Sequence, residues 1–197
     1  MTVIEKFDDM MKRNNGYLTT ADVVAAGYSK TYLAEYIRQR NMERVAQGVY
    51  MSSDVWLDEM YIIHLRNKNA VFSHESALYM HNLIDSEPTA VMLTVPKGYN
   101  AKHLKERECR VYYVPTDIFE MGRIEKETNF GNKVYVYDMD RTICDIIRYK
   151  DKLEIQTFQT ALREYMRSKD KNIHNLMKYA EKMKISDKVR VYTEVML

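Results

Sequence analysis

Apolar residues near the start of the chain recur every three or four positions, a spacing that predicts short amphipathic helices. The first pattern spans residues 3–13, and a second lies between Thr20 and Gly27. A threonine hydroxyl suits the start of a helix, and a glycine, which adopts positive φ readily, suits its end. A third pattern runs from Ser29, a candidate N-cap, to Arg40 without an interrupting glycine or proline. We therefore predict a succession of helices in this stretch.

The third predicted helix has an apolar side and a polar side. Leu33 and Ile37 lie four residues apart and are expected to face inward together. At about 100° per residue, the opposite side is polar, aromatic and cationic. It holds Thr31, Tyr32, Glu35, Arg38 and Gln39. Such a surface is what a helix that meets DNA requires.

Two strand-like runs after this helix predict a hairpin. Residues 43–46 and the run GVYM that ends at Met51 are joined through Gln47 and Gly48, and the glycine suits a hairpin turn. The polar residues 52–54 then mark a break. Helices followed by a two-stranded ribbon are typical of a winged helix-turn-helix. We therefore predict a DNA-binding domain of this type over residues 1–52, ending at that break.

The rest of the chain mixes helical and strand patterns. Helical spacing covers 54–66, 73–82, 140–149, 154–167 and 172–183, and the ambiguous end KVRVYTEVML favours a helix. Strand-like runs cover 70–72, 90–95, 110–114, part of 118–127, and 133–137. The prediction is an α+β protein in which residues 53–197 form a mixed α/β C-terminal domain, with a small sheet flanked by helices.

Composition places limits on the class of protein. The 197 residues are 46% hydrophobic, enough to bury a core. Apolar runs fall far short of the roughly 20 residues that cross a bilayer, and the N-terminal segment lacks the pattern of a signal peptide. Cys109 and Cys144 are not spaced as a zinc motif and are expected to be buried thiols. We expect a cytoplasmic protein with no membrane contact and no cofactor.

Charge is distributed unevenly, although the net charge is only +2. Residues 1–52 hold 7 Lys and Arg against 6 Asp and Glu, and residues 53–145 hold 11 against 15. Residues 146–190 hold 12 against 6. Two zones of positive net charge therefore flank an acidic middle, and these zones are where an anionic polymer would be attracted.

The candidate DNA contacts lie on the third predicted helix and on the hairpin. The N-terminal residues of a recognition helix reach base edges or phosphates in the major groove, and a hairpin can contact the backbone or the minor groove. The candidates are Ser29, Lys30, Thr31, Tyr32, Arg38, Gln39, Arg40, Arg44 and Gln47. The alternative is a module for protein contact, because the charge of this stretch is modest and winged helices serve that role too.

A second group of cations lies on the C-terminal helical patterns. Lysine and arginine on exposed helix faces are usually just solvated, but this group is dense enough to predict a secondary basic face that adds phosphate contacts. Its members are Arg163, Arg167, Lys169, Lys171, Lys178, Lys182 and Lys184.

The histidines do not predict a metal site. His74 and His81 share one face of a predicted helix at a spacing of i, i+7, with Glu75 beside them. Zinc proteases instead use histidines one turn apart. We therefore predict surface or packing roles for both histidines.

An acidic cluster follows the strand at 133–137. Asp138 and Asp140 could form a magnesium-binding pair of a nuclease or nucleotidyltransferase. No third acidic partner or glycine-rich phosphate loop accompanies them. We favour a structural role, in which Asp140 caps a helix and Arg141 pairs with Asp145 one turn later.

Three stretches follow one another along the chain: the N-terminal region ending in VAQGVYM, the segment FSHESALYMHNLID with EPTAVMLTVP, and YVYDMDRTICDIIRYKDKL leading into FQTALREYM. In this order they resemble the AbiEi-type antitoxin family of type IV toxin–antitoxin (abortive infection) systems. The resemblance implies an N-terminal winged helix-turn-helix that binds inverted repeats in operator DNA and represses its own operon.

The same resemblance implies that the C-terminal domain counteracts a nucleotidyltransferase-like toxin without forming a stable complex with it. The C-terminal basic residues would then serve either DNA binding or antitoxicity. A metal-dependent enzyme using Asp138 and Asp140, and a winged-helix module for protein interaction, are the alternatives. We expect no catalytic activity.

Overall fold

The computed structural model describes residues 2–196, which form two compact units. Helices hold 50% of the chain and strands 17%, so this is a mixed α and β protein with two small sheets. The first unit contains the residues up to Lys68 together with Glu127–Val134, and the second contains the remainder. The first unit thus continues past the boundary expected at residue 52. Within the described chain, no helix combines the length and the apolar character needed to cross a membrane.

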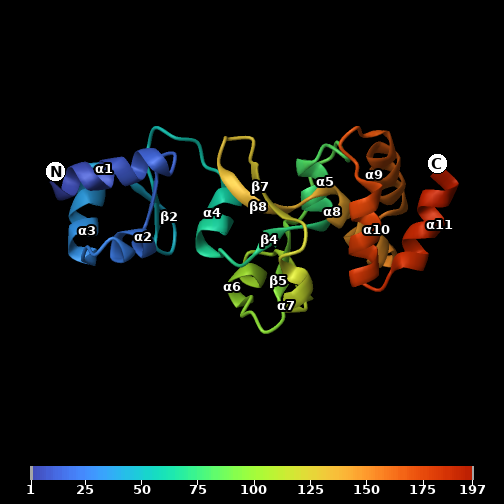
Figure 1. Ribbon diagram of the computed structural model, residues 1–197. Coiled ribbons are helices and arrows are strands. Elements are labelled where there is room, and N and C mark those ends of the chain that lie inside the picture. Colours follow the sequence, from blue (N-terminus) through green and yellow to red (C-terminus); the bar gives the residue numbers. More distant parts are fainter. Residues whose placement is uncertain (1, 197) are drawn as a thin grey trace. The chain divides into compact units, whose positions relative to one another are not determined.

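The first unit begins with helices and a small sheet (Figure 1). The helices are α1 (Val3–Arg13), α2 (Thr20–Ala25) and α3 (Lys30–Gln39). The strands are β1 (Tyr17–Thr19), β2 (Glu43–Ala46) and β3 (Val49–Met51), antiparallel in the order β1-β3-β2. Gly48 has a φ of 71° and turns the β2-β3 hairpin. The helices and the hairpin predicted for this stretch are confirmed.

An apolar core orients α3. Leu33 and Tyr36 are each 3% exposed, and the ring of Phe7 from α1 meets the Tyr36 ring edge-on, 5.2 Å between centroids. Ile37, predicted to face inward, is only half-buried at the edge of this core. Because residues three apart share a helix face, burial of Leu33 and Tyr36 leaves the side that includes Thr31 to solvent.

Tertiary hydrogen bonds decide where α4 (Glu59–Arg66) begins. The Tyr17 hydroxyl accepts a bond from the Asp58 amide at 2.9 Å. The Asp58 carboxylate accepts bonds from the side chains of Thr128 and Asn132 and caps the first turn of α4. The helix predicted to start at residue 54 therefore starts at 59, because these distant partners hold Asp58 in an extended conformation.

The second unit is built on a five-stranded sheet in the order β6-β5-β4-β8-β7. Its strands are β4 (Val71–Phe72), β5 (Met92–Pro96), β6 (Arg110–Val114), β7 (Arg123–Glu127) and β8 (Lys133–Tyr137), the β7-β8 tip belonging to the first unit. β4 is antiparallel to β5 and parallel to β8, and β5 is parallel to β6. The short helices are α5 (His74–Met80), α6 (Lys102–Glu106) and α7 (Thr116–Phe119).

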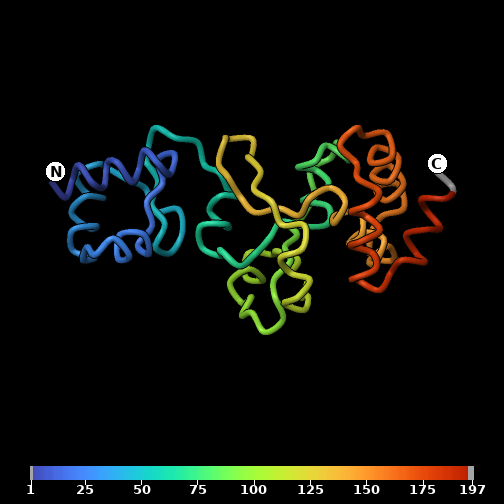
Figure 2. Tube along the Cα trace, viewed as in Figure 1, coloured from blue at the N-terminus to red at the C-terminus, as the bar shows by residue number. Residues whose placement is uncertain are grey.

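Four longer helices complete the described part of the second unit. They are α8 (Met139–Arg148), α9 (Ile155–Arg167), α10 (Ile173–Lys182) and α11 (Ser186–Met196), with a 3-10 turn at Lys150–Lys152 after α8. The trace in Figure 2 follows them from orange to red. α8 contacts α5 and each of the other three, so it is the central helix of this unit. The helix predicted at the C-terminus is confirmed, and Leu197 lies outside the described residues.

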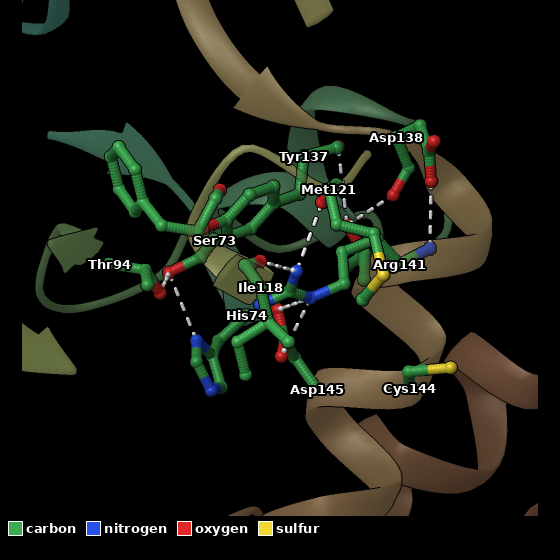
Figure 3. A network of polar contacts seen from close by, with 12 residues as sticks. Ser73, His74, Thr94, Ile118, Met121, Tyr137, Asp138, Arg141, Cys144 and Asp145 are labelled. Carbon is green, nitrogen blue, oxygen red and sulfur yellow. Dashed lines mark hydrogen bonds and ion pairs between the residues drawn. The ribbon is translucent and has the colours of Figure 1, made fainter. Parts of the chain in front are cut away.

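The side chain of Arg141 is fully buried near the start of α8 (Figure 3). Its Nε donates to the Asp145 carboxylate at 3.2 Å, which confirms the predicted pair. Its Nη1 donates to the carbonyls of Ile118 and Met121 at 2.6 and 2.9 Å. The guanidinium also lies over the Tyr137 ring, 4.2 Å from the centroid. Because burying a charge is costly without partners, these contacts tie α8 to α7 and to the turn that follows α7.

Gly122 allows that turn to approach α8. A Cβ atom at this position would lie 2.7 Å from the Cβ of Arg141, and the backbone has a φ of 76°. Both the contact and the conformation exclude a side chain here.

His74 packs beside the same network. It is 1% exposed, its Nδ1 lies 3.0 Å from the Ser73 hydroxyl, and its ring stacks on Tyr112 at 3.6 Å. Burial lowers the pKa of His74 to about 3, and the positive charges of Arg141 and Lys152 add to this effect. Of the two roles predicted for this histidine, packing is the one observed.

Several local predictions need correction. The spacing of apolar and polar residues does not predict β1, α6 or α7, because elements of three to five residues are too short to show a helical or strand repeat. β1 forms because it pairs with β3, which follows α2 and α3 in the sequence. Ser29 occupies the N-cap position of α3, but its hydroxyl makes no capping hydrogen bond.

Replacing Arg141 should destabilise the second unit. Arg141→Met leaves the Asp145 charge and two carbonyls without their partner, and we expect a loss of about 3–5 kcal/mol in the free energy of unfolding. Adding Asp145→Leu removes the stranded charge and should recover part of that loss. Urea titration followed by far-UV circular dichroism measures both variants. Arg148→Met, at an exposed position of the same helix, is the control, and a similar loss in it would contradict this role.

Stability should fall as the pH is lowered from 7 to 4. At a pH between the folded pKa of His74, about 3, and its unfolded pKa of about 6.5, the unfolded chain binds a proton at this residue and the folded chain does not. At pH 4 this difference lowers the free energy of unfolding by about 3 kcal/mol. His74→Asn should remove that part of the slope in urea titrations at pH 7, 5 and 4. Ser73→Ala keeps the imidazole and should keep the slope. Equal slopes for wild type and His74→Asn would contradict the assignment.

Candidate nucleic-acid interface

The outer side of α3 is a solvent-facing polar surface. Lys30, Thr31, Tyr32, Arg38 and Gln39 are all exposed, as is Ser29 just before the helix. Tyr32 is 55% exposed, so most of its aromatic ring is accessible to a ligand. The first turn of α3 carries no acidic residue. Free backbone amides and the helix dipole therefore give this end a positive potential.

Glu35 modifies the middle of this surface. Its carboxylate forms an ion pair with Arg38 one turn on and accepts a hydrogen bond from Gln39 at 2.9 Å. The hydrogen bonds from Arg38 and then Gln39 lower the pKa of Glu35, so the carboxylate is charged at neutral pH. Glu35 thus holds the side chains of Arg38 and Gln39, and a phosphate or base edge must compete with Glu35 to bind them.

Arg40 differs from the other candidates because it joins α3 to α1. Its guanidinium pairs with the Asp8 carboxylate, which also accepts a bond from the Tyr36 hydroxyl at 2.6 Å. The hydrogen bond to Asp8 raises the pKa of Arg40. This arginine has a structural partner and a partly neutralised charge, which the sequence pattern did not indicate.

The hairpin and the start of α3 border an open pocket of about 530 Å³ within the first unit. Lys30, Arg44 and Gln47, all proposed from the sequence, line it together. Arg66, from the last turn of α4, is a further lining residue. The complete lining is Thr19, Thr20, Ala21, Lys30, Arg44, Gln47, Gly48, Val49, Tyr50, Leu65 and Arg66.

The walls of this pocket follow from local structure. The Thr20 amide donates to the Gly48 carbonyl at 2.8 Å, which holds the hairpin turn against the start of α2. The β2-β3 register shifts between Arg44 and Ala46, a bulge that changes the direction of the strand beside Arg44. Buried Val49 and half-buried Leu65 provide an apolar floor.

The sign of the lining charges distinguishes this pocket from a hollow of similar volume in the second unit. The pocket with Lys30 has no acidic residue in its lining. The other hollow, of about 520 Å³, combines Arg110 and Lys152 with four acids, Glu75, Asp85, Glu87 and Glu154. A polyanion is therefore attracted to the first and repelled by much of the second.

The secondary basic face predicted on the C-terminal helices is spread over α9, α10 and the turns after them. Arg163 and Arg167 are exposed on α9, and each lies near the Glu164 carboxylate, at 3.7 and 3.2 Å. Lys171 is half-buried and donates to the Ser168 carbonyl at 3.1 Å. The other members, Lys169, Lys178, Lys182 and Lys184, are exposed.

Asp138 and Asp140 have structural partners. Asp138, rather than Asp140 as predicted, caps α8 by accepting a bond from the Arg141 amide at 2.7 Å. Its other oxygen accepts a bond from the Tyr179 hydroxyl at 2.9 Å. Burial raises the pKa of Asp138. The cap moves because an extended Asp138 faces the first free amides, while Asp140 already lies inside the helix.

Asp140 instead connects three helices. It is 6% exposed, and one carboxylate oxygen accepts bonds from the Tyr165 hydroxyl and the Asn172 amide at 2.7 and 2.9 Å. Within residues 2–196, His, Cys, Asp and Glu side chains nowhere gather in threes to hold a metal ion. Cys109 and Cys144 are buried thiols, as predicted.

Comparisons with known proteins inform the fold alone. No family model and no curated protein matches the chain. Among solved structures, the chain is similar to the RV2827C protein from Mycobacterium tuberculosis, with a TM-score of 0.57 and 11% identity over 88% of this chain and 69% of that one. Because identity is so low, this likeness supports the mixed α and β architecture and leaves function to the geometry of the sites.

Proposed function

We propose that the first unit binds duplex DNA as a winged helix-turn-helix, with α3 as the recognition helix and the β2-β3 hairpin as the wing. The observation that carries this proposal is the exposed side of α3 beside the acid-free pocket of Lys30, Arg44 and Gln47. The element order from α1 to β3, with the hairpin in an antiparallel sheet, also supports it.

Each part of this surface has a distinct task. Thr31, Tyr32 and Arg38 present a hydroxyl, an aromatic ring and a guanidinium that reach base edges in the major groove. Lys30 and Arg44 neutralise phosphates, which set affinity and register without reading sequence. The modest charge of residues 1–52 limits non-specific binding, so the base contacts carry a large part of the discrimination.

The biological role that we propose is that of a type IV antitoxin and autorepressor, which rests on the resemblance of the sequence to the AbiEi-type family. The first unit represses the operon at inverted repeats, and the second unit opposes a nucleotidyltransferase-like toxin without a stable complex. The exposed lysines after α9 and on α10 are available to either activity.

Variants of α3 test the DNA-binding part. Thr31→Ala and Arg38→Ala should each weaken binding to an inverted-repeat fragment of the protein's own promoter by about 1–3 kcal/mol, because each removes a base contact. Fluorescence anisotropy measures the affinity, and circular dichroism checks the fold. Unchanged affinity in both variants would reject α3 as the recognition helix.

Two further variants sharpen that test. Glu35→Gln removes the acid that competes for Arg38, so binding should tighten at low salt and the gain should fade as salt screens the charge. Arg107→Ala changes an exposed arginine of the second unit and should leave affinity unchanged.

The antitoxin part has a separate test. We expect the gene of a nucleotidyltransferase-like protein next to the gene of this chain, and growth arrest by that protein should be relieved by co-expression of the chain. Relief should persist in Thr31→Ala, since the second unit would carry it. The absence of such a neighbour, or of any relief, would reject this part while leaving DNA binding in place.

A further inference from the structure

We propose that Arg66 of α4 completes a binding site for a backbone phosphate of the duplex, together with Lys30 and Arg44. The site extends the DNA-contacting surface beyond the helix-turn-helix and its hairpin, into a helix that the sequence pattern assigns to the C-terminal domain. The inference rests on the proposed DNA binding and names a residue and a ligand group for it.

Three cations from separate elements meet at one pocket. Lys30 comes from the start of α3, Arg44 from β2 and Arg66 from the last turn of α4, and all line the same hollow of about 530 Å³. With no acidic residue in the lining, nothing there balances their charge. An unbalanced set of this kind is compensated by an anion of matching size and charge.

The side chains of these three cations are also free to bind a ligand. Within the described chain, no hydrogen bond or ion pair is made by the side chain of Lys30, Arg44 or Arg66. Arg38 and Arg40 differ, because each pairs with a carboxylate. The free cations of this surface therefore lie in the pocket rather than along the helix face.

Arg66 suits phosphate better than an exposed lysine would. It is half-buried, so part of its stem is already ordered and less side-chain entropy is lost on binding. Its planar guanidinium donates two parallel hydrogen bonds to phosphate oxygens. Thr20 and Gln47 provide neutral donors in the same lining.

A phosphodiester is the ligand that fits because the pocket is open and adjoins the proposed recognition helix. Lys30 belongs both to the pocket and to the first turn of α3. A phosphate held there places the backbone beside the helix end that enters the groove. This fixes the register of α3 on the duplex without reading sequence.

Salt dependence tests the site. Full-length wild type, Arg66→Gln and the control Lys68→Gln are titrated with a fluorescent random-sequence duplex and with the promoter fragment at several salt concentrations. Lys68 is exposed, lies two positions further on and is absent from the pocket lining. Arg66→Gln should reduce the slope of log K against log salt by about one unit on both duplexes. Lys68→Gln should match wild type.

The outcomes separate this inference from the proposed function. If the wild type binds DNA and Arg66→Gln has the same slope of log K against log salt, the phosphate site is rejected. The assignment of α3 as the recognition helix would then still stand. Binding that lacks preference for the promoter, but still depends on Arg66, would reject sequence-specific repression and support the site. A chain that binds neither duplex at low salt would reject both. Circular dichroism of Arg66→Gln must match wild type, and Arg66→Lys should restore part of the slope because it restores the charge.

Discussion

The burial of one guanidinium constrains much of the second unit. A charged Arg141 side chain away from water needs partners, and its Nε and Nη1 donate to Asp145 and to the carbonyls of Ile118 and Met121. The carbonyls belong to α7 and to the turn after it, and that turn can approach α8 closely because Gly122 has no side chain. The position of α8, and of the helices that pack on it, therefore depends on a polar contact inside an apolar core.

The acidic residues around Arg141 extend this constraint. Asp138 caps α8 and binds Tyr179 of α10, while Asp140 binds Tyr165 of α9 and the amide that starts α10. These bonds explain why a cluster with the composition of a magnesium site serves as a structural hub. In this buried setting, one oxygen of Asp138 and one oxygen of Asp140 accept bonds from α9, α10 or the residue that starts α10, and these bonds favour one mutual arrangement of the helices.

The first unit shows how packing creates a functional surface. Burial of Leu33 and Tyr36 turns Thr31 and Arg38 to solvent, and the bond between Thr20 and Gly48 holds the hairpin turn against the start of α2. The surface is not uniformly available, since Glu35 and Asp8 engage two of its arginines. Its free charge is concentrated in the pocket, and that distribution favours a phosphate anchor next to a reading helix.

Helix periodicity, turn glycines and β-branched runs in the sequence were enough to predict the helices of the first unit, its hairpin, the main strands and helices of the second unit, and the Arg141–Asp145 pair. These features are local, so residues within one turn or one strand determine them. Tertiary structure decided the rest. β1 exists through its pairing with β3, α4 starts at Glu59 because distant partners hold Asp58, and Arg66 joins Lys30 at one pocket although a hairpin separates them along the chain. Each of these depends on contacts between segments far apart in sequence, and no local pattern encodes them.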